Sequence, residues 1–288
     1  MDNTQVKTIF SGKMKRNSHL RKRTFALVVC FGIFLMIVTV TGFLLGERAI
    51  TTDFSRKNML PGIPYIFGTD WMGRDMFART LRGLASSIFI GMLASGVSAL
   101  IALVLGTAAA TLGRRADAAI TWLIDLMMGV PHIVLLILIS YAVGKGFWGV
   151  MVGVAVTHWP SLCRILRGEI LQIKEAPYIG IARRLGKSPW YIAKKHIFPQ
   201  VLPQFLVGLV LLFPHAILHE ASITFLGFGL PPEKPAIGII LSESMSYLGT
   251  GKWWLALFPG LALVVVVVLF SQIGNGLRTL LDPASAHI

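Results

Sequence analysis

The sequence predicts an all-α integral membrane protein with six transmembrane helices. Of the 288 residues, 55% are hydrophobic and 14% are charged, whereas roughly a quarter of the residues in a soluble domain are charged. Six apolar segments also approach or exceed the roughly 20 residues that a helix needs to cross a bilayer. These segments are residues 25–46, 87–112, 118–143, 147–163, 201–225 and 253–277.

Lysines and arginines predict the orientation of these helices. Residues 25–46 are longer than the apolar part of a signal peptide, so we expect them to remain as the first span. Most of the 27 lysines and arginines then lie on the side of the N-terminus, and the positive-inside rule places that side in the cytoplasm. The predicted organisation is a cytoplasmic N-terminus (1–24), a first helix (25–46), an extracytoplasmic loop (47–86), a core domain (87–277) with a cytoplasmic loop (164–200), and a cytoplasmic tail (278–288).

Two classes of ligand are not expected on this chain. The net charge of +14 does not predict nucleic-acid binding, because the basic residues are spread over loops between apolar segments. The sequence also lacks the G-x4-G-K-[ST] pattern of a phosphate-binding loop, so we expect no ATP and no other cofactor bound by this chain.

The two longer outside loops have compositions that predict local structure. The first contains FGTDWMGRD, in which Asp70 and Asp75 predict Asx-type turns between glycines, followed by a helix; the alternative is a solvated loop. The second, residues 227–252, is rich in glycine and proline and predicts a re-entrant segment or a surface lid.

Residues 178–203, which we call the elbow, predict two short helices joined by a rigid corner. One side of the first helix carries apolar residues at helical spacing, namely Tyr178, Ile181, Ala182 and Leu185. Gly186 can end this helix in the left-handed conformation. Ser188 then predicts an N-cap, with Pro189 in the first turn of the second helix.

A helical corner of this kind has two possible uses. It can dock on another protein, or it can lie among lipid headgroups and attract anionic lipid through its basic residues, which are Arg183, Arg184, Lys194 and Lys195. A rigid corner favours docking, because lipid requires no defined angle.

Polar residues within the predicted spans are candidates for function, because they are costly in a membrane. His215 and His219 lie four residues apart, so one helical face can present both imidazoles to a metal ion or another ligand. Glu220 follows directly, and Pro214 can kink the helix. The alternative is that both histidines form hydrogen bonds with neighbouring helices.

The other polar residues in the spans predict structural roles. Asp125 lies about a third of the way into the third span, and we expect it to pair with an arginine. His132 is seven residues further on, on the same face of a continuous helix. His158 lies in the short fourth span, where we expect a hydrogen-bonded packing residue.

Four motifs together resemble the peptide/nickel group of bacterial ABC-importer permeases, in particular the second, shorter permease of each pair. They are GTDWMGRD (68–75), the elbow, EASITFLGFGLPPEKPAIG (220–238), and WWLALFPGLALVVVVVLF with the later GNGLRTLLDP (253–283). In the first motif the matching residues are Gly68, Thr69, Asp70, Gly73, Arg74 and Asp75. The resemblance covers the chain from about residue 20 onward.

This resemblance implies a type I importer permease with a MetI-like fold in the bacterial inner membrane. The implied partners are a second permease, two ATPases that bind ATP and magnesium, an extracytoplasmic substrate-binding protein and membrane lipid. The two outside motifs are implied to face the binding protein. No step is chemical, so no catalytic residue is expected and the chain is not an enzyme.

The elbow of this chain resembles the EAA loop of the family, a cytoplasmic loop that docks on an ATPase. The motif glycine corresponds to Gly186, and its later I-x-P corresponds to Ile197 and Pro199. The glutamate that gives the EAA loop its name corresponds to Gly180 in this chain, and the alanine after it corresponds to Ile181. A salt link from this position to the ATPase is therefore in doubt. The coupling residues implied by the resemblance are Tyr178, Gly180, Ile181, Ala182, Leu185, Gly186, Ser188, Pro189, Ile197 and Pro199.

The cargo is predicted from the fifth span. Nickel-type members resemble this chain in carrying paired histidines there, so we predict nickel, free or chelated, with di- or oligopeptides as the alternative. The candidate pathway or metal residues are His215, His219 and Glu220. Two other classes are weaker hypotheses. A secondary transporter would show inverted repeats, and a metalloprotease would show H-E-x-x-H.

Overall fold

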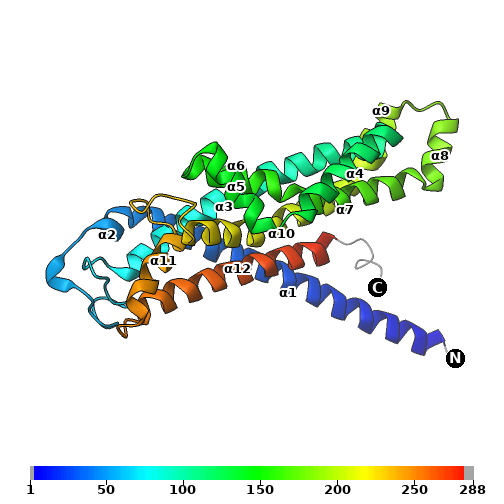
Figure 1. The fold of residues 1–288 in the computed structure, drawn as a ribbon. Helices are drawn as coiled ribbons and strands as arrows, with labels where there is room; N and C mark the ends of the chain where they lie inside the picture. Colours follow the sequence, from blue (N-terminus) through cyan, green and yellow to red (C-terminus); the bar gives the residue numbers. More distant parts are fainter. Residues whose placement is uncertain (1–2, 282–288) are drawn as a thin grey trace.

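The computed structural model describes residues 3–281, with side chains from residue 21 onward, and the described part is helical (Figure 1). Five helices are long and apolar enough to cross a membrane, and a sixth crossing is possible if one sharply bent pair counts as a single span. The elements are α1 (Asn3–Leu44), α2 (Gly46–Ile50), the short 3-10 helix η1 (Phe54–Arg56), α3 (Met76–Thr111), α4 (Arg114–Gly129), α5 (His132–Val143), α6 (Phe147–Thr157), α7 (Trp159–Lys174), α8 (Pro177–Arg184), α9 (Pro189–Ile192), the π-helical turn η2 (Ala193–Ile197), α10 (Phe198–Phe225), α11 (Ile237–Leu248) and α12 (Trp254–Leu281).

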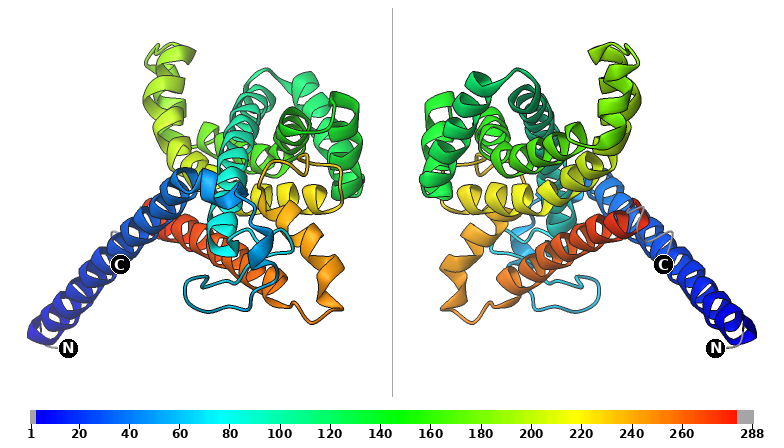
Figure 2. Two further views of the ribbon diagram at one scale, coloured as in Figure 1. Left: turned by 90° about the vertical axis from the view of Figure 1, so that its left-hand side faces the viewer. Right: turned by 90° about the vertical axis from the view of Figure 1, so that its right-hand side faces the viewer.

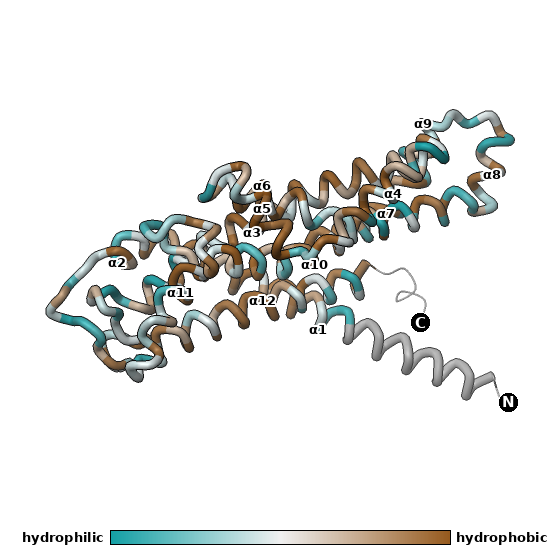
Figure 3. The backbone as a smooth tube through the Cα atoms, viewed as in Figure 1, coloured by the Kyte–Doolittle hydropathy of each residue, from teal (hydrophilic) through white to brown (hydrophobic). Residues whose placement is uncertain are grey.

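The molecule is elongated, and its two ends differ. The N-terminal part of α1, the end of α12 and the elbow helices α8 and α9 lie toward one end, whereas the loop after α2 and the turn before α12 lie at the other (Figure 1). The long helices are largely hydrophobic between these ends, and hydrophilic residues gather near both of them (Figure 3). The described ends of α1 and α12 and the elbow therefore lie toward the same end of the molecule.

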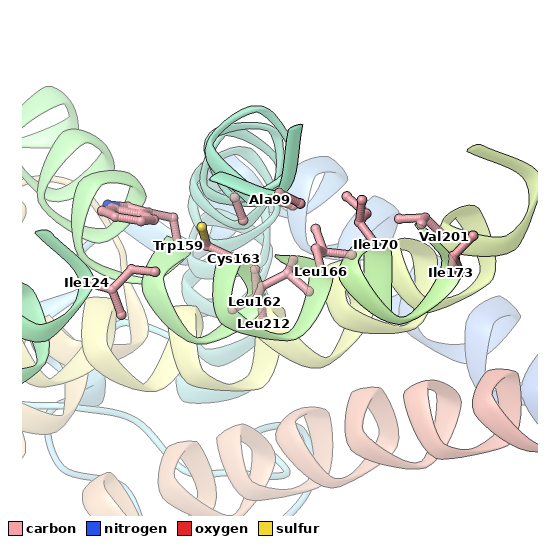
Figure 4. Close-up of a cluster of buried hydrophobic side chains, with 12 residues drawn as sticks. Ala99, Ile124, Trp159, Leu162, Cys163, Leu166, Ile170, Ile173, Val201 and Leu212 are labelled. Atoms are coloured by element: carbon pink, nitrogen blue, oxygen red, sulfur yellow. The ribbon is translucent and has the colours of Figure 1, made fainter. Parts of the chain in front are cut away.

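The helix α3 lies at the centre of the bundle and contacts α1, α7 and α10. Along α7, buried apolar residues recur every three or four positions and face α3 and α10 (Figure 4). Gly106 of α3 lies where a side chain would meet the backbone of α7: a Cβ there would be 3.0 Å from the Cys163 carbonyl oxygen. A small residue thus allows close helix contact, which is a common basis of helix association in membranes.

The third predicted span, residues 118–143, forms two helices, so the expectation of one continuous helix was wrong. The chain breaks between Gly129 and His132, and α4 and α5 meet at an angle of 99°. Val130 adopts an extended conformation with ψ 137°, because the ring of Pro131 disfavours helical backbone in the residue before it. Asp125 and His132 therefore do not share one helical face.

The fourth predicted span, residues 147–163, extends further than expected. The helices α6 and α7 meet at His158 and together run from Phe147 to Lys174 as one candidate span. The cytoplasmic loop predicted to begin at residue 164 therefore begins in helix, and non-helical chain first appears at Glu175. Two ion pairs join α7 to α4: Arg167 with Asp117, and Arg164 Nη2 with Asp125 Oδ1 at 2.8 Å. The predicted arginine partner of Asp125 is confirmed.

Helices also enter both outside loops and the predicted tail. The last eleven residues of the predicted loop 47–86 belong to α3, which begins at Met76. Residues 227–252 contain α11, whose residues Ile237, Ile239 and Ile240 are buried, and which contacts α12 and α10. This segment folds back onto the bundle rather than forming a loose lid. The predicted tail 278–288 begins in α12, and its last seven residues lie outside the described part.

Candidate functional site

The elbow has the local structure that its sequence predicts. Gly186 has a φ of +73°, and the chain closes α8 with hydrogen bonds from Gly186 N to Arg183 O and from Lys187 N to Ala182 O, both near 3 Å. This pair of bonds is the Schellman arrangement that a left-handed residue makes possible. Ser188 Oγ accepts a hydrogen bond from Tyr191 N and caps α9. The corner is therefore fixed by backbone geometry.

The apolar residues of the elbow divide into a buried and an exposed group. Ile179, Ala182 and Ile192 are buried against one another and hold α8 against α9. Of the apolar face predicted on α8, only Ala182 belongs to this interior. The others are exposed, together with Trp190 of α9: the exposed fractions are Tyr178 40%, Ile181 59%, Leu185 71% and Trp190 76%.

The exposed group stands clear of the bundle. Figure 2 shows the elbow projecting from the other helices at one end of the molecule. Gly180 is exposed too, and a Cβ placed there would meet no other atom within 4 Å. The corner thus presents apolar and basic side chains for contact with something outside the chain.

The GTDWMGRD motif forms a compact turn at the opposite end of the molecule. Gly68 and Gly73 have φ values of +71° and +74°. Asp70 Oδ1 accepts hydrogen bonds from Met72 N and Arg74 N, at 2.8 and 3.0 Å. Asp75 caps α3 by accepting from Phe77 N. The predicted Asx turns and the following helix are confirmed, and the alternative of a solvated loop is wrong.

Most of this motif is buried rather than exposed. Thr69 and Asp70 are fully buried, and the Thr69 carbonyl oxygen accepts a hydrogen bond from Trp254 Nε1 of α12 at 3.3 Å. The motif's side chains therefore stabilise this end of the molecule. Arg79 forms ion pairs with Asp70 and with Glu243. Neither Arg79 nor Glu243 was singled out from the sequence, because the two residues are far apart in the chain and meet only in the fold.

A cavity of about 680 Å³ opens at the junctions between α4 and α5 and between α6 and α7, next to α10. Three of the four histidines that line it, His132, His158 and His219, each offer a ring nitrogen within 4.8 Å of the others. We call these three residues the histidine cluster. Its composition and its position in a cavity make it the candidate ligand site of the chain.

The sequence prediction named His215 and His219, and only His219 belongs to the histidine cluster. His215 lines the cavity but does not belong to the cluster; its carbonyl oxygen accepts a hydrogen bond from His219 Nδ1 at 2.8 Å. His219 instead contacts His158, whose Nε2 lies 3.3 Å from His219 Nδ1. His158 is hydrogen-bonded as predicted, but it belongs to the cluster as well.

Glu220 does not join the histidines. Its side chain is fully buried, and Oε1 accepts a hydrogen bond from Thr224 Oγ1 at 3.0 Å on the same helix. Within the described residues Oε2 has no hydrogen-bond partner. A role for Glu220 as a ligand beside His215 and His219 is therefore not consistent with this arrangement.

Comparisons with known proteins agree with this architecture. Residues 102–287 match the family described as "Binding-protein-dependent transport system inner membrane component". Two similar proteins come from Bacillus subtilis. The dipeptide transport system permease protein DppC is 30% identical over 266 residues, which cover 92% of this chain and 83% of DppC. The oligopeptide transport system permease protein OppC is 30% identical over 273 residues, covering 93% and 89%.

Two solved transporters show the same fold. A chain of the inward-facing MetNI methionine ABC transporter aligns with a TM-score of 0.60 and 17% identity, over 72% of this chain and 98% of its own. A chain of an amino acid ABC transporter aligns with a TM-score of 0.56 and 16% identity, over 70% and 94%. The relatives are named as permease subunits rather than enzymes. The chain belongs to the binding-protein-dependent ABC-importer permeases, as a multi-pass inner-membrane subunit of the peptide/nickel group with a MetI-like fold.

Proposed function

We propose that this chain forms half of a translocation pathway, and that a second, different permease forms the other half. Two separate ATPases would bind ATP and magnesium, and an extracytoplasmic binding protein would deliver the cargo. Family membership supports these partners, since relatives across the whole chain are named as permeases of transport systems. The cavity at the broken helix supports a pathway role, because polar side chains line it inside a largely apolar bundle.

The elbow is proposed to be the ATPase-docking site. This proposal rests mainly on the exposed apolar residues Leu185 and Trp190, 71% and 76% exposed, at a corner fixed by Gly186. Large apolar side chains gathered on a protruding surface are typical of protein interfaces. The elbow also lies toward the same end as the described ends of α1 and α12 (Figure 1), which fits a cytoplasmic placement of all three.

For the cargo, we propose di- or oligopeptides as the first candidate. The names of the relatives support peptides, and this reverses the order that the sequence alone favoured. Nickel, free or chelated, remains a second candidate because of one specific observation: three imidazoles converge in the cavity, and imidazole is a good ligand for divalent nickel.

Uptake by the reconstituted assembly tests this proposal. Proteoliposomes containing both permeases and the ATPases, supplied with the binding protein, would be offered labelled dipeptide or labelled nickel in the presence of ATP. We expect ATP-dependent dipeptide uptake. Nickel uptake without dipeptide uptake would replace the first candidate by the second, and ATP-independent uptake of either would contradict the importer mechanism.

A further inference from the structure

Three imidazole rings from separate helices meet at one point of the cavity. His132 is the first residue of α5, His158 lies at the junction of α6 and α7, and His219 comes from α10. The ring centres are 4.5 to 5.0 Å apart. The residues are 26 and 61 positions apart in the chain, so only the fold brings them together.

Hydrogen bonds orient two of the rings. His158 Nδ1 lies 2.9 Å from the Val154 carbonyl oxygen, and His219 Nδ1 lies 2.8 Å from the His215 carbonyl oxygen. A carbonyl oxygen only accepts, so each Nδ1 carries the hydrogen and each Nε2 presents its lone pair. Metal-binding histidines are commonly held by such a bond from the nitrogen that does not bind the metal.

The third ring has an unsatisfied nitrogen. His132 Nε2 is buried and has no hydrogen-bond partner among the described residues. If the three histidines were only packing residues, the contact between His158 and His219 would satisfy those two, but His132 Nε2 would remain unpaired. A buried polar atom without a partner is costly, and a metal ion would satisfy this nitrogen together with the other two.

The break in the third span gives His132 its position. Pro131 forces Val130 out of the helical conformation, and α5 starts at His132 at a steep angle to α4. His158 likewise occupies a junction, because it is both the C-cap residue of α6 and the N-cap residue of α7. Two interruptions of regular helix therefore bring ring nitrogens toward His219.

The cluster's chemistry selects among metal ions. Three neutral imidazoles with no carboxylate among them suit nickel, copper, zinc and cobalt rather than magnesium or calcium, which prefer oxygen. In a tetrahedral site with metal–nitrogen bonds of about 2.1 Å, ligand nitrogens are roughly 3.4 Å apart. One ring nitrogen of each histidine lies within 4.8 Å of one from each of the others, so the three ligand nitrogens would have to approach one another by up to about 1.4 Å to hold a metal ion.

We propose that His132, His158 and His219 bind one divalent transition-metal ion inside this chain. Three protein ligands leave at least one coordination position open, and the adjoining cavity of about 680 Å³ has room for water or a small chelator in that position. Only the location of the metal site in a transport pathway depends on the proposed function. Metal binding itself does not depend on the identity of the cargo.

Metal binding by the purified assembly in nanodiscs tests the site directly. Nickel would be titrated by calorimetry, and cobalt by its visible absorption, which reports coordination geometry. The variants are His132→Gln, His158→Gln and His219→Gln, with His215→Gln as the matched control from the same cavity. Each cluster variant is expected to lower metal affinity at least tenfold, and the control less than threefold.

Partner chains can bind metal as well, so the signal that counts is the difference between the wild type and the triple cluster variant. The proposal is overturned if that difference is zero, or if His215→Gln lowers affinity as much as His219→Gln. Where a variant fails to assemble, electron paramagnetic resonance of copper bound to the wild type replaces it. Coupling to three nitrogens supports the site, and coupling to one or none rejects it.

These outcomes separate the site from the proposed function. Metal binding together with dipeptide uptake keeps both, and rejects only nickel as the cargo. Nickel uptake without metal bound at the cluster rejects the site and leaves the importer in place.

Discussion

Asp70 Oδ2 lies 3.1 Å from Arg79 Nη1, and both side chains are buried. The same oxygen accepts a hydrogen bond from Arg74 Nε at 2.6 Å. Arg79 in turn forms an ion pair with Glu243 of α11. The Asp70 cluster, as we call these four residues, thus connects the GTDWMGRD turn, the start of α3 and the segment before α12. The GTDWMGRD motif was expected in an outside loop, but in the structure its buried ion pairs hold neighbouring segments together.

Replacing Asp70 by asparagine is expected to destabilise the subunit strongly. The amide keeps the size of the side chain but removes the charge that faces Arg74 and Arg79. Removing one partner of a buried ion pair typically costs about 3–5 kcal/mol. Thermal unfolding of the detergent-solubilised complex would show a lower transition temperature for this variant.

Asp53→Asn is the matched control for this prediction. Asp53 lies in the same outside segment and pairs with Arg56, but its side chain is 38% exposed. Because water screens this pair, the transition temperature should barely change. A similar loss for both variants would show that burial of the Asp70 cluster is not what stabilises this end.

Local signals in the sequence were sufficient for the turns and caps. Ser188 followed by Pro189, Gly186 after a short helix, and Asp75 before α3 each act on the backbone next to them, and the structure contains all three caps. The same reasoning fails for prolines within spans. Pro131 breaks a helix, whereas Pro214 lies inside continuous α10, because packing by neighbouring helices decides whether a proline ends a helix in a membrane.

The candidate site could be predicted only in part. The i, i+4 spacing of His215 and His219 correctly marks the region, but His219 turns toward His158 and its Nδ1 bonds the His215 backbone. No spacing rule relates His132, His158 and His219, because their proximity depends on two helix interruptions and on the packing of α10. Contacts between distant segments are the part that one sequence does not reveal.

Replacing Glu220 by glutamine is expected to preserve the fold. Glu220 is fully buried, and one carboxyl oxygen has no partner among the described residues. Glutamine keeps an oxygen for the hydrogen bond from Thr224 and buries no charge. Glu220→Met has a similar length but cannot accept that bond, so it should lower stability by about 1–3 kcal/mol. Thermal unfolding in detergent compares the two, and a less stable glutamine variant would contradict the prediction.

Asp53 provides a prediction about pH outside the membrane-spanning segments. The pKa of Asp53 is below its ordinary value of 3.8, first because the Ser55 hydroxyl donates to it, then because the Ser55 amide does, with Arg56 contributing less. A depressed folded-state pKa adds stability above the ordinary value, and that stability is lost as pH falls through the folded-state pKa.

Ser55→Ala should therefore raise the pKa of Asp53 toward 3.8, and Arg56→Gln should raise it less. Carbon-13 NMR of labelled aspartate carboxyls in nanodiscs would follow the titration. If the arginine variant shifted the pKa more than the serine variant did, charge rather than hydrogen bonding would control this aspartate.

Substituting alanine at two glycines of the elbow separates backbone geometry from surface chemistry. At both Gly186 and Gly180, an added Cβ would meet no atom within 4 Å, so steric clash does not distinguish them. Gly186 has a φ of +73°, where alanine costs roughly 1–2 kcal/mol. Gly180 lies inside α8, where alanine should stabilise the helix by up to about 1 kcal/mol.

Gly186→Ala should weaken capture of the ATPase by the membrane-inserted permeases, because the corner can no longer hold Leu185 and Trp190 at a fixed angle. Gly180→Ala should capture it as the wild type does. Pull-down from detergent extracts, with the amount of inserted permease measured in parallel, compares the two variants, and equal capture by both would mean that the left-handed corner is not required for docking.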